Sequence, residues 1–79
     1  MKLYEYANNP HDKDSFLIFL DVLKDDYMSN KESWENQSID TFLDAIHGWI
    51  SDYNRDDIDF SNPTWKDIAA IFYVGKIYE

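Results

Sequence analysis

The stretch PTWKDIAAIFYVGKIY, residues 63–78, decides the expected fold because it reads as a helix that is apolar on nearly every side. Thr64 and Asp67 have the three-residue spacing of a capping box, which places the start of the helix at Thr64. The charged positions before the C-terminal residue are Lys66, Asp67 and Lys76. Such a helix is expected to be central and to touch the other helices of a small domain. The alternative is that one of its faces meets another chain through Ala70, Tyr73 and Ile77.

Two amphipathic segments precede this helix. In residues 12–28 the apolar positions recur at helical spacing, at Phe16, Phe19, Leu20, Leu23 and Tyr27. Asp12 is the expected N-cap, after the turn at Pro10. In residues 38–53 the apolar set is Ile39, Phe42, Leu43, Ile46, Trp49, Ile50 and Tyr53, and the opposite polar stripe is Asp40, Asp44, His47 and Ser51. Ser38, or else Asn36, is expected to start this second helix.

The three segments together predict an all-α fold. We expect a compact three-helix domain, with helices over about 12–28, 38–53 and 64–78 and long ordered connections. At 79 residues the chain should form one domain, and its three Trp, six Tyr and five Phe supply the dense core that a short chain needs. Residues 2–7 are consistent with a short extended arm, although their mixed pattern decides little.

Trp34 is surrounded by polar residues in SWENQS, residues 33–38, between the first two helices. This connection is longer than a typical helix connection, and such loops are normally held down by their own side chains. We therefore expect Trp34 to be a peg buried in the core, with an exposed anchor for a partner as the alternative. Asn36 is expected to be a turn or cap residue whose side chain satisfies backbone groups.

The charge balance limits the kinds of partner. Seven basic and sixteen acidic residues give a net charge of −9, which argues against nucleic acid or an anionic membrane and favours a basic partner. The plain alternative is that the acidic surface only keeps the domain soluble. The chain has no cysteine, no signal-peptide pattern and no apolar run of the ~20 residues that cross a membrane, so we expect a soluble cytoplasmic protein.

Catalytic chemistry has little support in the sequence. The two histidines, His11 and His47, have no cysteine or second histidine at metal-ligand spacing. Asp44, His47 and Ser51 would share one solvated helix face, with no pocket that could shift a pKa. We therefore expect no enzymatic activity and no cofactor.

One segment partly matches a calcium-binding loop. Asp52, Asn54 and Asp56 fit the first three ligand positions of an EF-hand. The match then fails, because Asp57 stands where the loop needs glycine and Pro63 stands where it needs a bidentate Glu. We expect no metal site there, and interpret the segment as a polar connection between two helices.

The segments SWENQSIDTFLDAIHGWISD (33–52), TWKDIAAIF (64–72) and KIYE (76–79) carry a family resemblance. Their order is similar to that in a family of short acidic bacterial domains without assigned biochemistry, over roughly residues 12–79. Some small acidic proteins of this kind are immunity proteins beside polymorphic toxins, including those of contact-dependent growth inhibition. The resemblance implies a fold and an immunity role, and it brings no catalytic residues with it.

Acidic residues collect where a helix favours cations. The C-terminal end of a helix carries partial negative charge, so each acid there costs about 0.3 to 1 kcal/mol. The first predicted helix ends near Asp25 and Asp26, and the second runs into an acidic segment in which Arg55 is the only basic residue. Acids that break this charge preference without evident compensation indicate a functional role. The candidate partner-binding residues are Asp52, Tyr53, Asp56, Asp57 and Asp59, followed by Glu32, Trp34 and Glu35.

These observations predict an immunity protein that binds and neutralises a cognate bacterial toxin. The expected toxin is a basic protein, most plausibly a nuclease, whose active site would receive carboxylates where substrate phosphates lie. The alternative is an acidic nucleic-acid mimic that inhibits DNA-binding proteins, which the seven interspersed basic residues weaken. The sequence leaves the oligomeric state and the crossing of the helices open.

Overall fold

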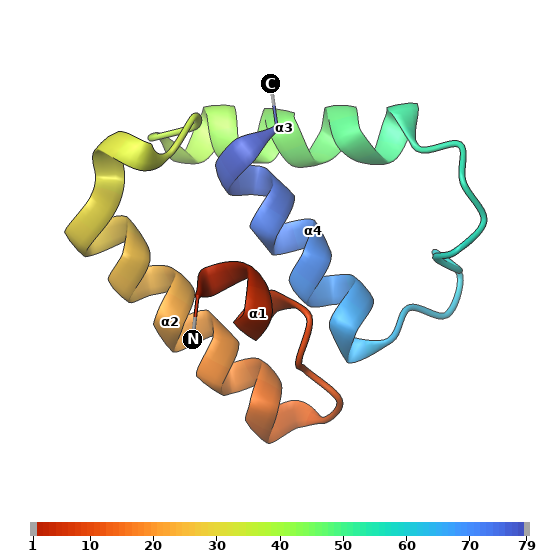
Figure 1. The fold of residues 1–79 in the computed structure, drawn as a ribbon. Helices are drawn as coiled ribbons and strands as arrows, with labels where there is room; N and C mark the ends of the chain where they lie inside the picture. Colours follow the sequence, from red (N-terminus) through yellow and green to blue (C-terminus); the bar gives the residue numbers. More distant parts are fainter. Residues whose placement is uncertain (1, 79) are drawn as a thin grey trace.

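Helix α4 (Trp65–Ile77) is the central element of the computed structural model, which describes residues 2–78 (Figure 1). It packs against α1 (Leu3–Ala7), α2 (Lys13–Asn30) and α3 (Ile39–Asp52). Helices α2 and α3 instead splay apart, and no Cα atom of one lies within 8 Å of a Cα atom of the other. The described residues contain no β-strand, so the predicted all-α fold and the central position of the last helix are both confirmed.

The helix starts lie where local chemistry places them. Asp12 caps α2, because its carboxylate accepts a hydrogen bond of 2.9 Å from the backbone N–H of Ser15. Thr64 and Asp67 form the reciprocal pair predicted for α4, with bonds of 3.1 and 3.0 Å. Ser38, rather than Asn36, is the N-cap of α3. Side-chain caps of this kind satisfy the first backbone donors of a helix.

One expectation about the N-terminal half is wrong, and the end of the first long helix differs slightly from the expected one. Residues 2–7 do not form an extended arm, because Leu3–Ala7 is a helix whose Ala7 is buried and whose Leu3 and Tyr6 pack against the core. The first long helix also runs past residue 28 to Asn30 and continues into one 3₁₀ turn, η1 (Lys31–Ser33). Contacts with α2 and α4 stabilise α1, which is too short to be stable alone.

The core is built mainly from aromatic side chains of α2 and α4. Phe16, Phe19 and Leu23 are buried on the predicted face of α2, and Phe16 lies 5.3 Å from Trp65 and 6.1 Å from Phe72 between ring centroids. Helix α3 buries only part of its apolar set. Among the residues of that set, those left exposed are Ile39, Leu43 and Ile50. One neighbouring helix cannot cover so wide an apolar arc, and α2 lies too far away to help.

Candidate partner-binding surfaces

The predicted site residues lie in two places, at opposite ends of α3 (Figure 1). Glu32, Trp34 and Glu35 belong to the Trp34 loop, residues 31–37, which precedes the helix. Asp52 closes the helix, and the other acids follow in the acidic connection, residues 53–64. A helix of 14 residues spans about 21 Å, so the two groups do not form one cluster.

Trp34 is the buried peg that its position predicted. Its side chain is 6% exposed and packs edge-on against Tyr27, with 5.0 Å between ring centroids, and stacks on Phe42 at 6.2 Å. Its indole N–H donates a hydrogen bond of 2.8 Å to Asp26. An exposed aromatic anchor at this position is therefore excluded. Any partner contact at this end would use the exposed residues beside it, such as Glu32 and Glu35.

Asp26 is held by a second, distant residue. The Lys76 ammonium lies 2.9 Å from the same carboxylate oxygen that accepts from Trp34, and the two charged side chains are 18% and 14% exposed. Burial pushes the pKa of Asp26 upward, but the hydrogen bonds from Lys76 and Trp34 outweigh it and hold that pKa below its ordinary value. The prediction that this acid lacks compensation is wrong. Its partner Lys76 is fifty residues away in sequence, so a pattern of neighbouring residues cannot predict the pair.

The Trp34 loop also closes the C-terminal end of α4. The side-chain amide of Asn36 donates to the carbonyls of Gly75 and Tyr78 at 3.0 and 2.8 Å. The backbone N–H of Glu35 donates to the carbonyl of Lys76 at 3.0 Å. These bonds satisfy carbonyls that a helix end leaves without partners. The predicted capping role of Asn36 is confirmed, and the loop acts as structural support.

The acidic connection is ordered by contacts of its own. The Tyr53 hydroxyl donates a hydrogen bond to Asp57, and the Arg55 guanidinium lies 3.8 Å from the same carboxylate and 5.0 Å from the centre of the Tyr53 ring. The hydrogen bond from Tyr53 is the main cause that lowers the pKa of Asp57. Partial burial, and then the bond to Asp57, raise the pKa of Tyr53. Tyr53 and Asp57 therefore form one network with Arg55.

The other predicted acids of this region have different surroundings. Asp52 accepts a hydrogen bond of 2.8 Å from the Tyr78 hydroxyl, which raises the pKa of that tyrosine. Asp59 accepts from the backbone N–H of Ser61 at 3.0 Å and so shapes a turn. Asp56 is exposed. The carboxylates are thus partly structural and partly presented to solvent.

An aromatic row supports this end of the molecule. The ring of Tyr53 lies 5.0 Å from that of Trp49 and 5.2 Å from that of Phe60, edge-on in both cases. Phe60 is 41% exposed. The exposed acids of the connection therefore stand beside aromatic surface, a combination that occurs at protein interfaces.

The residues considered for catalysis lie on the surface of α3. Asp44, His47 and Ser51 are all exposed on α3. Within residues 2–78, no three His, Asp or Glu side chains are grouped so that they could hold a metal ion. No helix in that range combines the length and the apolar character needed to cross a membrane.

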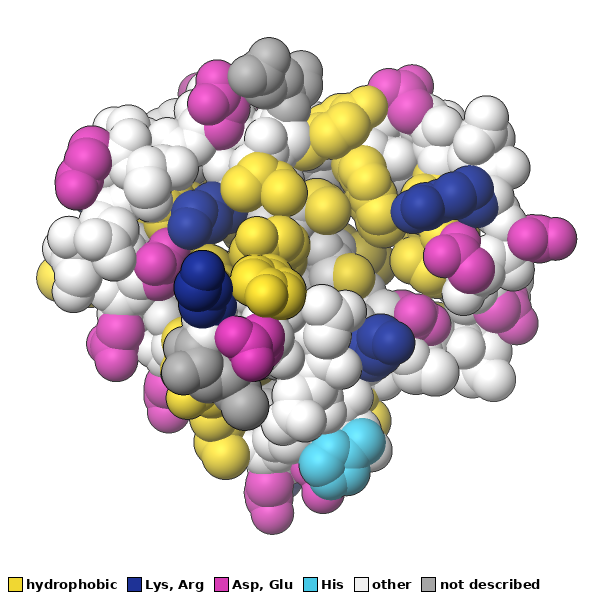
Figure 2. Space-filling view, in the orientation of Figure 1, with side chains coloured by type: hydrophobic (Ala, Val, Ile, Leu, Met, Phe, Trp, Pro, Cys, Tyr) yellow, Lys and Arg dark blue, Asp and Glu magenta, His cyan; other side chains and the backbone are white. Residues whose placement is uncertain are grey.

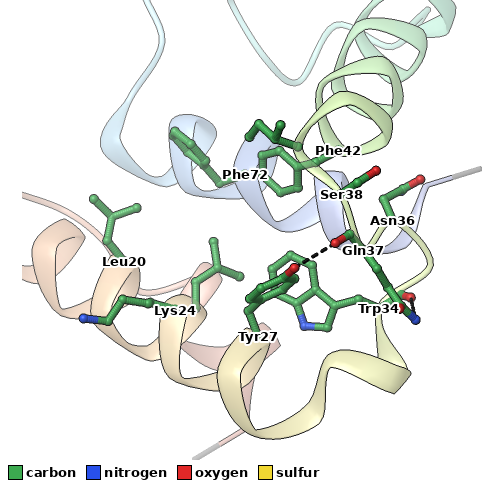
Figure 3. Close-up of a pocket in the computed structure, with 11 residues that line it drawn as sticks. Leu20, Lys24, Tyr27, Trp34, Asn36, Gln37, Ser38, Phe42 and Phe72 are labelled. Atoms are coloured by element: carbon green, nitrogen blue, oxygen red, sulfur yellow. Dashed lines mark hydrogen bonds between the residues drawn. The ribbon is translucent and has the colours of Figure 1, made fainter.

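A groove that the sequence analysis missed lies between α2 and α3 (Figure 3). It encloses about 400 Å³, with Leu20, Lys24 and Tyr27 on the α2 wall and Phe42 on the α3 wall. Its other lining residues are Leu23, Trp34, Asn36, Gln37, Ser38, Ile39 and Phe72. The one sequence signal for it was the excess of apolar positions in residues 38–53, more than a single neighbour can bury.

Comparison with known protein families gives a match. Searches of curated proteins and of solved structures find none. The model of a family of unknown function, DUF7660, matches residues 12–79, the span over which the resemblance was expected. The match includes α2, α3 and α4, and leaves α1 outside it. The chain therefore belongs to this family of unknown function.

Proposed function

We propose that this protein is a binding module that neutralises a basic partner, as an immunity protein does for a bacterial toxin in the cytoplasm. The observation that carries the proposal is the acidic connection. There, exposed Asp56, Asp57 and Asp59 stand beside the rings of Tyr53 and Phe60 in a chain of net charge −9. Carboxylates give attraction at long range, and aromatic rings give contact area at short range.

The order of the connection supports a binding role. Tyr53 is fixed by Trp49, Phe60 and the carboxylate of Asp57, so the acidic residues are presented on a structured support. A surface that is ordered before binding loses less conformational entropy in the complex. A nuclease that binds phosphate has a basic active site, and ordered carboxylates would complement it.

The proposal is tested by replacing Asp56, Asp57 and Asp59 together with Asn. We expect slower association with a cognate toxin, sought among the products of neighbouring genes, and a wild-type advantage that shrinks as salt is raised; stopped flow measures both. The matched control replaces three exposed acids of α2 with Asn, namely Asp14, Asp21 and Asp25. It removes the same charge from a different surface.

The comparison of the two triple variants decides between explanations. A loss confined to the variant of the acidic connection supports the proposal. Equal slowing in both variants would mean that net charge alone steers the encounter, and no slowing in either would remove the connection from the interface. Equal inhibition of several unrelated DNA-binding proteins by the wild type would instead favour a nucleic-acid mimic.

A further inference from the structure

Helix α3 presents a line of apolar side chains that the other helices of the described chain leave largely uncovered. Ile39, Leu43, Ile46 and Ile50 follow the spacing i, i+4, i+7, i+11, which keeps them on one face of the helix. Ile39 is 71% exposed, Leu43 is 56% exposed and Ile50 is 38% exposed, while Ile46 is half-buried. Single exposed apolar residues are normal, but a continuous stripe marks an interaction surface. We name these four residues the α3 stripe.

The α3 stripe adjoins the groove between α2 and α3. Ile39 belongs to both. Phe42, about one helical turn after Ile39, forms the groove wall (Figure 3). Figure 2 shows another face of the molecule, with hydrophobic side chains across its middle and acidic side chains around its edge, so exposed apolar surface is not confined to the groove. Stripe and groove together offer an elongated apolar surface, of the kind that receives a helix from another protein.

Charge decides which occupant fits. Helix α3 carries Asp40, Asp44 and Asp52 and has no Lys or Arg. A second copy would pair this helix with an identical one across a two-fold axis, which sets acidic flanks against acidic flanks and brings together two chains of net charge −9. A cationic partner would instead be attracted by these carboxylates. Lys24, on the α2 wall, is the one cation that lines the groove among the described residues.

We propose that the α3 stripe and the groove form the docking site for an amphipathic helix of a partner protein. The apolar face of that helix lies against Ile39, Leu43 and Phe42, and its Lys or Arg side chains lie beside Asp40 and Asp44. The stripe extends over about 17 Å, so the partner helix needs about three turns. The inference rests on the proposed function in that the partner is basic, and it adds the element by which the partner is held.

The test uses three labelled 18-residue helical peptides and fluorescence anisotropy. The first has leucines at i, i+4, i+7 and i+11 with flanking lysines, the second has glutamates in place of the lysines, and the third has serines in place of the leucines. We expect the first to bind the wild type at least about tenfold more tightly than either of the others, because only it matches both the apolar stripe and the acidic flank.

The protein variants locate the site. The double variant Ile39→Ser and Leu43→Ser should weaken binding of the Leu/Lys peptide at least about tenfold, since it removes two exposed apolar contacts without touching the core. The matched control, Ile18→Ser with Ile77→Ser, changes two isoleucines that are 54% and 47% exposed elsewhere and should bind as the wild type does. Circular dichroism checks that both variants are folded.

Three results would overturn the inference. The first is that the Leu/Lys peptide does not bind the wild type, and the second is that it binds the Ile39→Ser, Leu43→Ser variant as tightly as the wild type. The third is a wild-type dimer in light scattering that this variant abolishes, because a second copy would then be the occupant. Applying the Asp56, Asp57 and Asp59 variant in the same assay separates the two proposals. If this variant still binds the peptide and associates with the toxin at the wild-type rate, the acidic connection is not part of the interface, and the groove remains as the docking site.

Discussion

At the scale of single residues, two glycines on different helices show how tightly the chain packs at one point and how loosely at another. A Cβ built on Gly75 would lie 2.5 Å from a ring carbon of Phe42, which is itself packed against Trp34 and Phe72. A Cβ built on Gly48 would have its nearest neighbour, a ring carbon of Tyr78, at 3.5 Å, an ordinary contact. Close approach of α4 to the Phe42 ring therefore requires glycine at position 75.

Alanine substitution should separate these two glycines. Gly48→Ala should stabilise the protein by about 0.5 to 1 kcal/mol, because alanine loses less backbone entropy in a helix. Gly75→Ala gains the same propensity but must displace the Phe42 ring, so we expect a net loss of about 1 to 3 kcal/mol. Urea unfolding of both variants measures the difference. Equal stabilisation would show that Phe42 can move into the groove at no cost.

The Asp26 carboxylate makes stability depend on pH in a defined direction. Its pKa is lowered in the folded state, so its contribution is present above the ordinary carboxyl pKa of about 4 and is lost as pH falls through the folded value. At pH 7 we expect Asp26→Asn to cost on the order of 1 to 3 kcal/mol, because Lys76 and Trp34 lose a charged acceptor.

The check is the gap in unfolding free energy between wild type and Asp26→Asn, measured at pH 7 and near pH 3. The gap should narrow in acid. Asp25→Asn, at the exposed neighbouring position, serves as the control and should show little gap at either pH. A gap that stays the same near pH 3 would mean that the shape of the side chain matters and its ionisation does not.

At the scale of elements, local chemistry was enough to place the helix starts but not the helix neighbours. Asp12, Ser38 and Thr64 are caps that can be read from a few adjacent residues, and the structure has all three. Helix α1 was missed because its five residues make little more than one helical turn, too few to show a repeating pattern, and owe their order to distant contacts. The separation of α2 from α3 follows from how each meets α4, which no local pattern records.

The junction between the Trp34 loop and α4 offers a test at this scale. Asn36→Ala removes both side-chain donors to the last carbonyls of α4, and we expect a loss of about 1 to 2 kcal/mol. Asn36→Asp should cost more, because it adds negative charge at the negative end of the helix. Asn54→Ala, at an exposed position in the acidic connection, is the control. Thermal melts of the three variants measure these effects. Equal melting temperatures of the Asn36→Asp and Asn36→Ala variants would contradict the capping role of Asn36.

At the scale of the whole molecule, the apolar helix predicted over residues 63–78 does lie at the centre, where it contacts the other three helices of the described residues. The candidate site was less predictable. Sequence spacing grouped Ile39, Leu43 and Ile50 with Phe42, whereas in the structure Phe42 packs against Trp34 and Phe72 and the other three are exposed. The tie between Asp26 and Lys76 was hidden for the same reason, since it depends on where α2 and α4 meet.

The net charge gives the molecule a response to salt that individual contacts do not. A charge of −9 on 79 residues repels itself, and folding brings these charges closer together. Salt shortens the reach of that repulsion, with a screening length that falls from about 30 Å at 0.01 M to about 8 Å at 0.15 M. The Asp26–Lys76 pair is mostly shielded from solvent and is screened much less. We therefore expect the melting temperature to rise between these two salt concentrations by several degrees, the size that about 1 kcal/mol produces in a domain this small.

The variant with Asn at Asp56, Asp57 and Asp59 supplies the control for this response. Removing three negative charges changes the net charge from −9 to −6, so the rise in melting temperature with salt should be smaller than in the wild type. Scanning calorimetry at the two salt concentrations measures both slopes. A melting temperature that falls with salt would show that attractive surface pairs dominate over repulsion. Equal dependence of the melting temperature on salt in both proteins would show that these three carboxylates do not contribute to the repulsion that opposes folding. Cations of a partner that cover them would then not stabilise the fold.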